Sequence, residues 1–322
     1  MSVVLNFASH LPIVTLPDYL LLTPEQFSGH GQGGELVSQF ALHEVQRRLE
    51  KHEDFTKNIE KAFKETFLQV DEALKHEAII EPLYAGTTAC VALLRQNELI
   101  VANVGDSRAV LARRLRNTNS SDDEKGNESG VGADPKFILA SPTVPTQQLE
   151  AIDLSNDQNP DLPEEQSRIE NMGGFVSPPP EPGLSARVWL DIGCTQIGLA
   201  MSRSIGDHAV KPIGVIAEPV VTTHHVTEDD EFMIIASDGV WEFVESSEAV
   251  QIVNENLHLG ATKSCQALIE MAAARWHDEE GDYRDDITAL VIRLQHLWKS
   301  KDGKKPATKT PCNLSPVAEN AT

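Results

Sequence analysis

The stretch Val101-Ala102-Asn103-Val104-Gly105-Asp106-Ser107-Arg108 decides how the middle of this 322-residue chain is interpreted. In it an apolar run ends at a Gly-Asp-Ser turn, after which a second apolar run continues at 109–111. Another apolar run, 89–94, comes before it and is separated from it by Gln96-Asn97. Short apolar runs divided by such turn residues are typical of antiparallel strands joined in a meander. The stretch therefore predicts neighbouring antiparallel strands at 89–94, 99–104 and 109–111.

On both sides of this meander the chain shows helix and strand patterns that do not alternate regularly. Apolar residues at helical spacing, and Ser or Thr residues that suit helix starts, predict four helices, and two further apolar runs predict strands. The helices are expected at 35–51, at 59–74, from Ser246 and Ser247, and from Thr262, and the strands at Phe232–Ala236 and Ile287–Leu294. Strands mixed with paired helices favour an α+β fold over a doubly wound parallel sheet.

The remaining segments are distinguished by their composition. Residues 1–27 show no clear periodicity and are interpreted as an atypical N-terminal segment before a domain at 28–298. Residues 115–135 are polar, with almost no bulky apolar residue, which predicts a flexible insertion. The segment 160–186, rich in Pro and Gly, predicts a surface flap, and the Lys-containing segment 299–322 predicts a disordered tail.

The charge of the chain is strongly acidic, with 27 Lys and Arg against 49 Asp and Glu and a formal net charge of −22. A nucleic-acid-binding protein needs a basic patch, and this composition provides none, so we expect no nucleic-acid partner. Surplus carboxylates are compatible with divalent cations, although most of them are expected to lie on a solvated surface.

Cysteine spacing and apolar run length bear on the location of the protein. The four cysteines lie far apart and form no Cys-x-x-Cys pair, so they are interpreted as reduced thiols of an intracellular protein. They are Cys90, Cys194, Cys265 and Cys312. No run approaches the roughly 18 apolar residues of a membrane span, and the N-terminus lacks the basic start of a signal peptide. We expect a soluble monomer of the cytoplasm or nucleus that contacts no membrane.

Three short motifs could carry chemistry, and each has a structural alternative. Ser28–Gly34 is rich in Gly and opens a helix, where it could cradle a phosphate or simply form a tight turn. Asp238 follows an apolar strand, where it could face a cleft or form an Asx turn or helix cap. Asp285 and Asp286 enter the last strand, where adjacent carboxylates suit either a divalent cation or a solvated turn. For Asp286 the solvated turn is preferred.

Two further segments place an Asp after a Gly and close to an Arg. They contain Asp106 with Arg108, and Asp207 with Arg203. For both we expect a structural role, in which a buried carboxylate accepts from backbone N–H groups and pairs with an arginine.

Taken together and in this order, these segments resemble one family, the type 2C, metal-dependent (PPM) protein phosphatases. The resemblance extends over about residues 28–294. It rests on Gly29-His30-Gly31, Gly86-Thr87-Thr88-Ala89, Val101–Arg108, Asp157-Gln158-Asn159-Pro160, Arg168-Ile169, Gly173-Gly174-Phe175-Val176, Leu199–Asp207, Gly214–Pro219, Asp238–Trp241 and Asp285–Thr288.

The resemblance implies both a fold and an activity. The family fold is a sandwich of two antiparallel β-sheets, flanked by helices on both outer faces, with the active site at one end. Family members are protein serine/threonine phosphatases that hydrolyse phosphorylated proteins through a water activated by two Mg²⁺ or Mn²⁺ ions. This chain is therefore expected to be a hydrolase of phosphoserine and phosphothreonine with one of these metals as cofactor.

Residue roles follow from the resemblance position by position. Asp238 and Asp285 match metal ligands, and Gly29 matches a ligand that contributes its backbone carbonyl. His30 matches the general acid that protonates the leaving serine or threonine oxygen. Asp157 matches the ligand of a third, weaker metal, and Glu242 stands where an Asp often assists it.

The chain departs from the family pattern mainly before its first motif. Ser28 replaces the Asp that bridges the two core metals, and 1–27 contain neither the phosphate-binding Arg nor the Glu-Asp pair of the family hairpin. Losing a carboxylate between two dications should weaken metal binding, so fewer than two ions are possible. A smaller departure is Gln158, where the family usually has His.

Two interpretations follow from these departures. In the first, the chain descends from an active phosphatase and has an altered or truncated N-terminal end. In the second, it is a catalytically impaired member that binds phosphoproteins or regulates a partner. The site residues that remain favour the first interpretation, because a chain long free of catalysis has no evident need for them.

Overall fold

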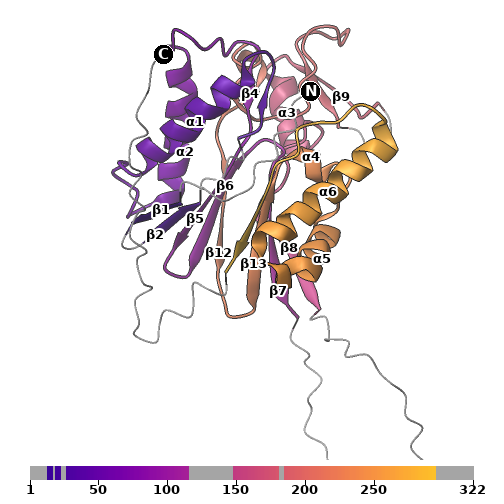
Figure 1. The fold of residues 1–322 in the computed structure, drawn as a ribbon. Coiled ribbons are helices and arrows are strands. Elements are labelled where there is room, and N and C mark those ends of the chain that lie inside the picture. The colour runs from indigo at the N-terminus through magenta and orange to yellow at the C-terminus, as the bar shows by residue number, and fades with distance from the viewer. Residues whose placement is uncertain (1–12, 17–18, 23–26, 116–147, 181–184, 295–322) are drawn as a thin grey trace, which may run out of the picture.

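The computed structural model describes residues 13–16, 19–22, 27–115, 148–180 and 185–294. Two antiparallel sheets lie face to face at the centre (Figure 1). In spatial order the first contains β1 (Ile13–Leu16), β2 (Tyr19–Leu22), β5 (Ala89–Arg95), β6 (Glu98–Val104) and β12 (Val220–His225). The second contains β14 (Ala289–Arg293), β13 (Asp230–Ala236), β7 (Arg108–Arg114) and β8 (Leu149–Asp153).

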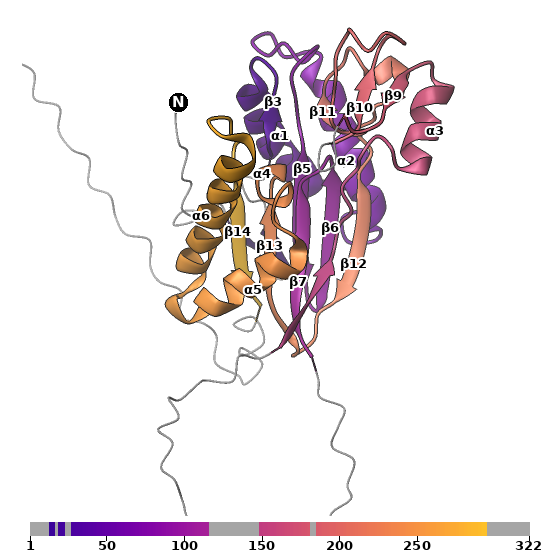
Figure 2. The same ribbon diagram turned by 90° about the vertical axis from the view of Figure 1, so that its right-hand side faces the viewer.

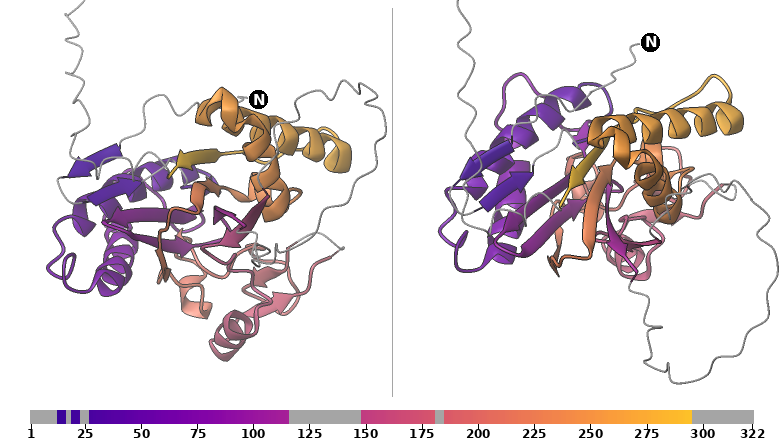
Figure 3. Two further views of the ribbon diagram at one scale, coloured as in Figure 1. Left: turned by 90° about the horizontal axis from the view of Figure 1, so that it is seen from below. Right: turned by 60° about the horizontal axis from the view of Figure 1, so that its bottom comes forward.

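Helices cover the outer face of each sheet. The pair α1 (Gly34–Leu49) and α2 (Ile59–Leu74) lies against the first sheet, and the pair α5 (Ser246–Asn256) and α6 (Ala261–Glu280) against the second. Figures 1 and 3 show the two helix pairs on opposite sides of the sheets. The predicted α+β sandwich with helices on both outer faces is therefore confirmed.

The layers arise from the alternation of side chains along each strand. On β5, Val91 and Leu93 pack in the cluster that includes α1 and α2, whereas Cys90 and Ala92 pack between the sheets. On β13, Ile234 packs on the α5–α6 side, whereas its two neighbours in the sequence pack between the sheets. Since successive strand residues point to opposite faces, each apolar strand supplies two of the three packed layers.

Small elements complete the end of the sandwich. A three-stranded sheet joins β11 (Ile205–Gly206), β4 (Gly86–Thr87) and β3 (Gly29–His30), and the short helix α4 (Asp238–Trp241) follows β13. Two 3₁₀ helices, η1 (Lys211–Ile213) and η2 (Leu257–Leu259), lie in connecting segments.

The predicted flap at 160–186 has structure of its own. It contains α3 (Pro163–Asn171) and β9 (Phe175–Ser177), and β9 pairs with β10 (Arg187–Trp189). This unit lies at the upper right in Figure 2, and Ile169 is fully buried in its own apolar cluster.

Most predicted elements occur as expected, and the structure adds one that the sequence did not predict. Residues 1–27 show no clear periodicity, yet β1 and β2 within them form a hairpin that pairs with β5. Each strand has only four residues, too few for an alternating pattern to be recognised. The predicted insertion at 115–135, apart from Leu115, and the predicted tail at 299–322 lie outside the described residues. No helix in the described part of the chain is long and apolar enough to cross a membrane.

Candidate functional site

A cavity of about 480 Å³ opens at one end of the sandwich. Its position follows from strand register, because Ala236 of β13 pairs with Arg108 at the start of β7 and with Ala289 at the start of β14. Loops that join these strand ends therefore meet at one place. Among the described residues that line the cavity, seven are acidic and two are arginines: Asp106, Asp157, Asp161, Asp238, Glu242, Glu280 and Asp285, with Arg108 and Arg187.

Asp238 is held at the cavity by a tight turn between β13 and α4. The Ser237 N–H donates to the Thr288 carbonyl at 3.0 Å, which joins this turn to the segment that carries Asp285. A Cβ at Gly239 would lie 2.4 Å from the Asp286 carbonyl oxygen, so the close approach requires glycine. Burial, and next the charge of Asp285, raise the pKa of Asp238 to about 7. Two carboxylates thus face each other where a cation would relieve their repulsion.

Among the described residues no arginine pairs with Asp106, so that prediction is wrong. Its side chain is 7% exposed, and its Oδ1 atom has no hydrogen-bond partner among the described residues. Burial, followed by the charges of Asp238 and Asp157, raises the pKa of Asp106 well above its ordinary value. Asp106 therefore belongs to the cavity rather than to a structural ion pair.

Arg108 instead pairs with Asp157. The guanidinium donates to both carboxylate oxygens of Asp157, at 2.9 and 2.5 Å, and to Ser246 Oγ at 3.0 Å. It also lies over the ring of Trp241, 5.1 Å from the ring centroid. The guanidinium of Arg108 therefore already neutralises the Asp157 carboxylate, and a metal ion would have to compete with it.

Gln158, which departs from the family pattern, has a structural role. It is 3% exposed; the Gly105 N–H donates to its Oε1 at 2.7 Å, and its Nε2 donates to the Asn103 carbonyl at 2.8 Å. The amide thus fixes the turn that carries Asp106 with both of its polar atoms.

Among the described residues Asp207 contacts His30, so the prediction that Asp207 pairs with an arginine is also wrong. The distance from His30 Nε2 to Asp207 Oδ2 is 2.7 Å, and Asp207 is 5% exposed. Burial lowers the pKa of His30, but the hydrogen bond and charge of Asp207, together with the charge of Asp238, outweigh it, so the pKa is raised. A Cβ at Gly86 would lie 2.0 Å from Asp207 Oδ2 and 2.8 Å from His30 Nε2, so this contact also requires glycine.

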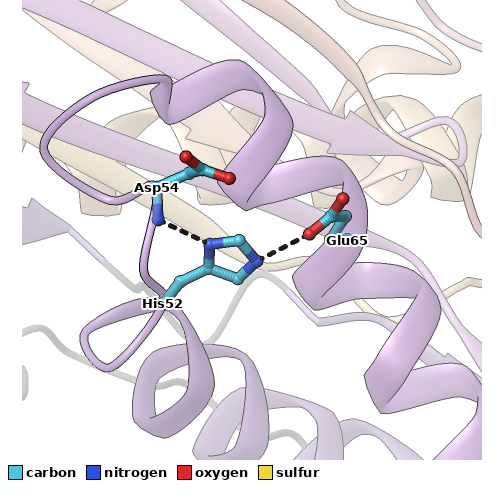
Figure 4. A group of neighbouring side chains, drawn as sticks. All are labelled: His52, Asp54 and Glu65. Atoms are coloured by element: carbon cyan, nitrogen blue, oxygen red, sulfur yellow. Dashed lines mark hydrogen bonds and ion pairs between the residues drawn. The ribbon is translucent and has the colours of Figure 1, made fainter.

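A separate group of His52, Asp54 and Glu65 has ligand atoms within 4.8 Å of one another (Figure 4), the one such group of three in the described part of the chain. Its hydrogen bonds account for it without a metal. His52 Nε2 contacts Glu65 at 3.0 Å, and its Nδ1 accepts from the Asp54 N–H at 3.1 Å. Lys61 Nζ lies 2.6 Å from Asp54 Oδ2 and 3.7 Å from Glu65 Oε1, so a lysine already neutralises both carboxylates. The group stabilises the connection between α1 and α2.

Comparison with known families decides the identity of the chain. The family model for protein phosphatase 2C matches residues 26–129 and 141–280. The chain belongs to the protein phosphatase 2C family.

Individual type 2C phosphatases show how far the similarity extends. A probable protein phosphatase 2C 73 of Arabidopsis thaliana is 35% identical over 237 residues, which cover 73% of this chain and 54% of that protein. A probable protein phosphatase 2C 75 of Oryza sativa subsp. japonica is 31% identical, over 79% of this chain and 51% of the relative. A probable protein phosphatase 2C 35 of Arabidopsis thaliana is 32% identical, over 84% and 73%. The chain thus spans about half the length of the first two relatives.

Solved structures support the same type 2C fold. A serine-threonine phosphatase 2C from Toxoplasma gondii superposes with a TM-score of 0.67 and 22% identity, covering 86% of each chain. A C. elegans sex-determining protein superposes with a TM-score of 0.60 and 18% identity, covering 87% of this chain and 58% of that one.

In this member of the type 2C family, the structure brings together most of the residues that the sequence singled out. Asp157, Asp238, Glu242 and Asp285 line one cavity. Gly29 and His30 are not among its lining residues, although the charge of His30 acts on the pKa of Asp238. The residues missed as site residues are Asp106 and Asp207, whose Gly-Asp pattern was recognised but assigned to structural pairing.

The donor set of the cavity fits the metal dependence of protein phosphatases 2C. Hard divalent cations prefer carboxylate oxygens, and here an oxygen of Asp106 is buried beside Asp238 without a hydrogen bond. The carboxylates do not close around a point, since the one tight group of three lies elsewhere in the described residues. An open arrangement of this kind suits ions that keep several water ligands.

Proposed function

We propose that this chain is a metal-dependent protein serine/threonine phosphatase that acts on phosphorylated proteins, with Mg²⁺ or Mn²⁺ at the carboxylate cavity. The observation that carries the proposal is the meeting of Asp106, Asp238 and Asp285 at one cavity in a chain of the 2C family. Burial, and next the charge of Asp285, raise the pKa of Asp238 to about 7, and a bound cation would relieve both effects.

The metal would be held chiefly by Asp238 and Asp285, with the backbone carbonyl of Gly29 as a further ligand. When bound, it supplies a nucleophilic water at neutral pH and positive charge for the phosphoryl oxygens. Asp157, assisted by Glu242, would hold the additional, weaker ion that the family resemblance implies, once Arg108 releases the Asp157 carboxylate. The Arg108–Asp157 pair weakens the binding of that ion, because the guanidinium competes for the same two oxygens.

His30 would protonate the leaving serine or threonine oxygen. Its raised pKa supports this role, because a general acid must carry its proton near neutral pH. The carboxylate of Asp207 holds the ring at one nitrogen, which limits the orientations in which the proton can be delivered.

A matched pair of neighbouring carboxylates tests the assignment. Asp285 lines the cavity, whereas Asp286 is exposed and is not among the lining residues. We expect Asp285→Asn to lower Mn²⁺-dependent hydrolysis of a phosphothreonine peptide at least about tenfold, since even outer partners of a metal site typically cost 10–100-fold when removed. Asp286→Asn should hydrolyse the peptide as the wild type does. Equal turnover in both variants would contradict the site, and metal binding without turnover in the wild type would instead support the non-catalytic interpretation.

A further inference from the structure

Asp106 is the unusual member among the buried acidic residues of the chain. Five acidic side chains are buried in the described residues: Asp106, Glu165, Asp207, Asp230 and Glu231. Four of them contact a basic side chain: Glu165 contacts Arg168 and Arg203, Asp207 contacts His30, Asp230 contacts Arg113, and Glu231 contacts Arg114. Among the described residues no arginine, lysine or histidine contacts Asp106, and its Oδ1 is without a hydrogen bond.

The surroundings of Asp106 make this isolation costly. A buried carboxylate is normally compensated by a cation or by hydrogen bonds, because taking its charge out of water is expensive. Here burial raises the pKa of Asp106 most, and the like charges of Asp238, Asp157 and Asp285 raise it further. The side chain also lines the cavity, so a cation that enters the cavity can reach it.

The turn that carries Asp106 lies next to Ser28, where the family has its bridging carboxylate. The Ser28 N–H donates to Thr88 Oγ1 at 3.3 Å, and Thr88 Oγ1 shares a hydrogen bond of 2.8 Å with Ser107 Oγ. A Cβ at Gly105 would lie 2.6 Å from Thr88 Cγ2, which shows how closely the turn packs against Thr88. Thr88 thus links the position of the missing carboxylate to the residues on either side of Asp106.

The same turn is held rigidly enough to serve as a ligand support. Gln158 fixes Gly105 and Asn103 through both polar atoms of its amide. Gly105 has φ of +100°, a backbone conformation that glycine adopts readily and other residues rarely. Groups that bind metals work best when the surrounding shell holds them in place before the metal arrives.

We propose that Asp106 is a metal ligand of the cavity, supplying from the β6–β7 turn a carboxylate that Ser28 cannot supply. The inference rests on the proposed function, because it assumes that the cavity binds a divalent cation. It extends that function by giving the chain a third core carboxylate beside Asp238 and Asp285. With it, the replacement at Ser28 weakens the metal site without removing the negative charge that the site needs.

The test is calorimetric titration of Mn²⁺, with melting temperatures, on the full chain and on three single variants. Asp106→Asn should bind Mn²⁺ at least about tenfold more weakly, because even outer partners of metal sites typically contribute 10–100-fold. The same variant should melt at a higher temperature than the wild type without metal, because an uncompensated buried carboxylate has been removed. Asp161→Asn is the matched control, since this exposed carboxylate lines the same cavity and its loss removes the same charge. Its Mn²⁺ affinity should stay within about threefold of the wild type because exposed charges interact weakly.

A metal ligand at position 106 predicts that Asp106→Asn lowers the Mn²⁺ affinity and raises the melting temperature without metal. A structural Asp106 would give a lower melting temperature without metal and an unchanged Mn²⁺ affinity, and that result would overturn the proposal. The Asp238→Asn variant shows whether a failure concerns the assignment of Asp106 or the proposed function as a whole. If it loses Mn²⁺ affinity while Asp106→Asn does not, the inference fails and the proposed function stands. If the wild type binds no Mn²⁺, both fail.

A second variant covers the case in which Asp106→Asn does not fold. A cysteine ligand favours soft cations, so Asp106→Cys should gain Cd²⁺ binding and a Cd²⁺–thiolate ultraviolet absorption relative to the wild type. The same variant should lose Mn²⁺ affinity. No difference from the wild type in Cd²⁺ absorption would overturn the assignment of Asp106.

Discussion

Replacing Glu165 with Gln should destabilise the protein strongly and in a pH-dependent way. Glu165 is 4% exposed and accepts from Arg168 at 2.6 Å and from Arg203 at 2.6 Å. It also accepts from Ser202, so it ties α3 to the segment that leads to Asp207. These donors outweigh burial and lower the pKa of Glu165 from 4.5 to about 2.

The magnitude follows from the pKa of Glu165. One pKa unit corresponds to about 1.4 kcal/mol, so the lowering of the Glu165 pKa from 4.5 to about 2 corresponds to about 3 kcal/mol of stability at pH 7. Because the folded-state pKa is the lower one, this stability is complete above pH 4.5 and disappears as the pH falls towards 2. At pH 3 about 1 kcal/mol should remain.

The assay is urea unfolding of the wild type, Glu165→Gln and Glu164→Gln at pH 7 and pH 3. Glu164 lies in the same turn of α3 but is exposed, so its variant should unfold within about 0.5 kcal/mol of the wild type. The reasoning would be refuted by equal losses in the two variants. A Glu165→Gln deficit of the same size at both pH values would also refute it, since the deficit must shrink as Glu165 is protonated in the wild type.

Two further substitutions test how the site is held. Gly86→Ala should push Asp207 away from His30. A general acid typically accelerates a reaction about 10²–10⁴-fold, so the turnover of a phosphothreonine peptide should fall at least about tenfold. Hydrolysis of p-nitrophenyl phosphate, whose leaving group needs no proton, should fall much less. Trp276→Phe removes the 2.7 Å hydrogen bond from Nε1 to the Gly239 carbonyl, so unfolding should become easier by about 1–3 kcal/mol and Mn²⁺ should bind more weakly.

Matched controls accompany these two substitutions. For Gly86→Ala the control is Gly193→Ala, whose new Cβ would meet only the side chains of Asp191 and Thr195, at 3.0 Å or more. An equal loss of turnover on both substrates for Gly86→Ala would indicate general disruption instead. For Trp276→Phe the control is Tyr283→Phe, which keeps the ring packed 5.9 Å from Trp276 and should change stability little. Equal destabilisation by both would contradict the importance of the indole hydrogen bond.

The sandwich could be predicted from sequence because its layers depend on periodic patterns. The helices at Gly34–Leu49 and Ile59–Leu74 bury one apolar face each, and each strand from Ala89 to Arg114 alternates between the central cluster and the cluster under one helix pair. The β1–β2 hairpin could not be predicted in this way. Its strands have four residues each and are specified by pairing with β5, which lies about 70 residues further along the chain.

Local sequence singled out candidate carboxylates beside apolar strands, but their roles came from the resemblance to the family. Asp106 and Asp238 both follow an apolar strand, and local sequence does not distinguish them. Whether such a carboxylate is paired depends on which arginine the fold brings to it. Arg108, two residues after Asp106, turns to Asp157, 49 positions away. In the same way His30 and Asp207 are 177 positions apart, so only the fold could reveal their contact.

In the proposed function, the charge of the cavity also constrains the order in which metal and substrate bind. The Arg108–Asp157 pair removes one carboxylate and one cation from the balance of the seven carboxylates and two arginines. Arg187 then remains as the other cationic side chain of the lining, and it is exposed and donates to the Gly198 carbonyl at 2.6 Å. A phosphate dianion approaching these residues alone would meet a strong net repulsion. The proposed function therefore requires that cations neutralise Asp238, Asp285 and Asp106 before the cavity accepts a phosphorylated side chain.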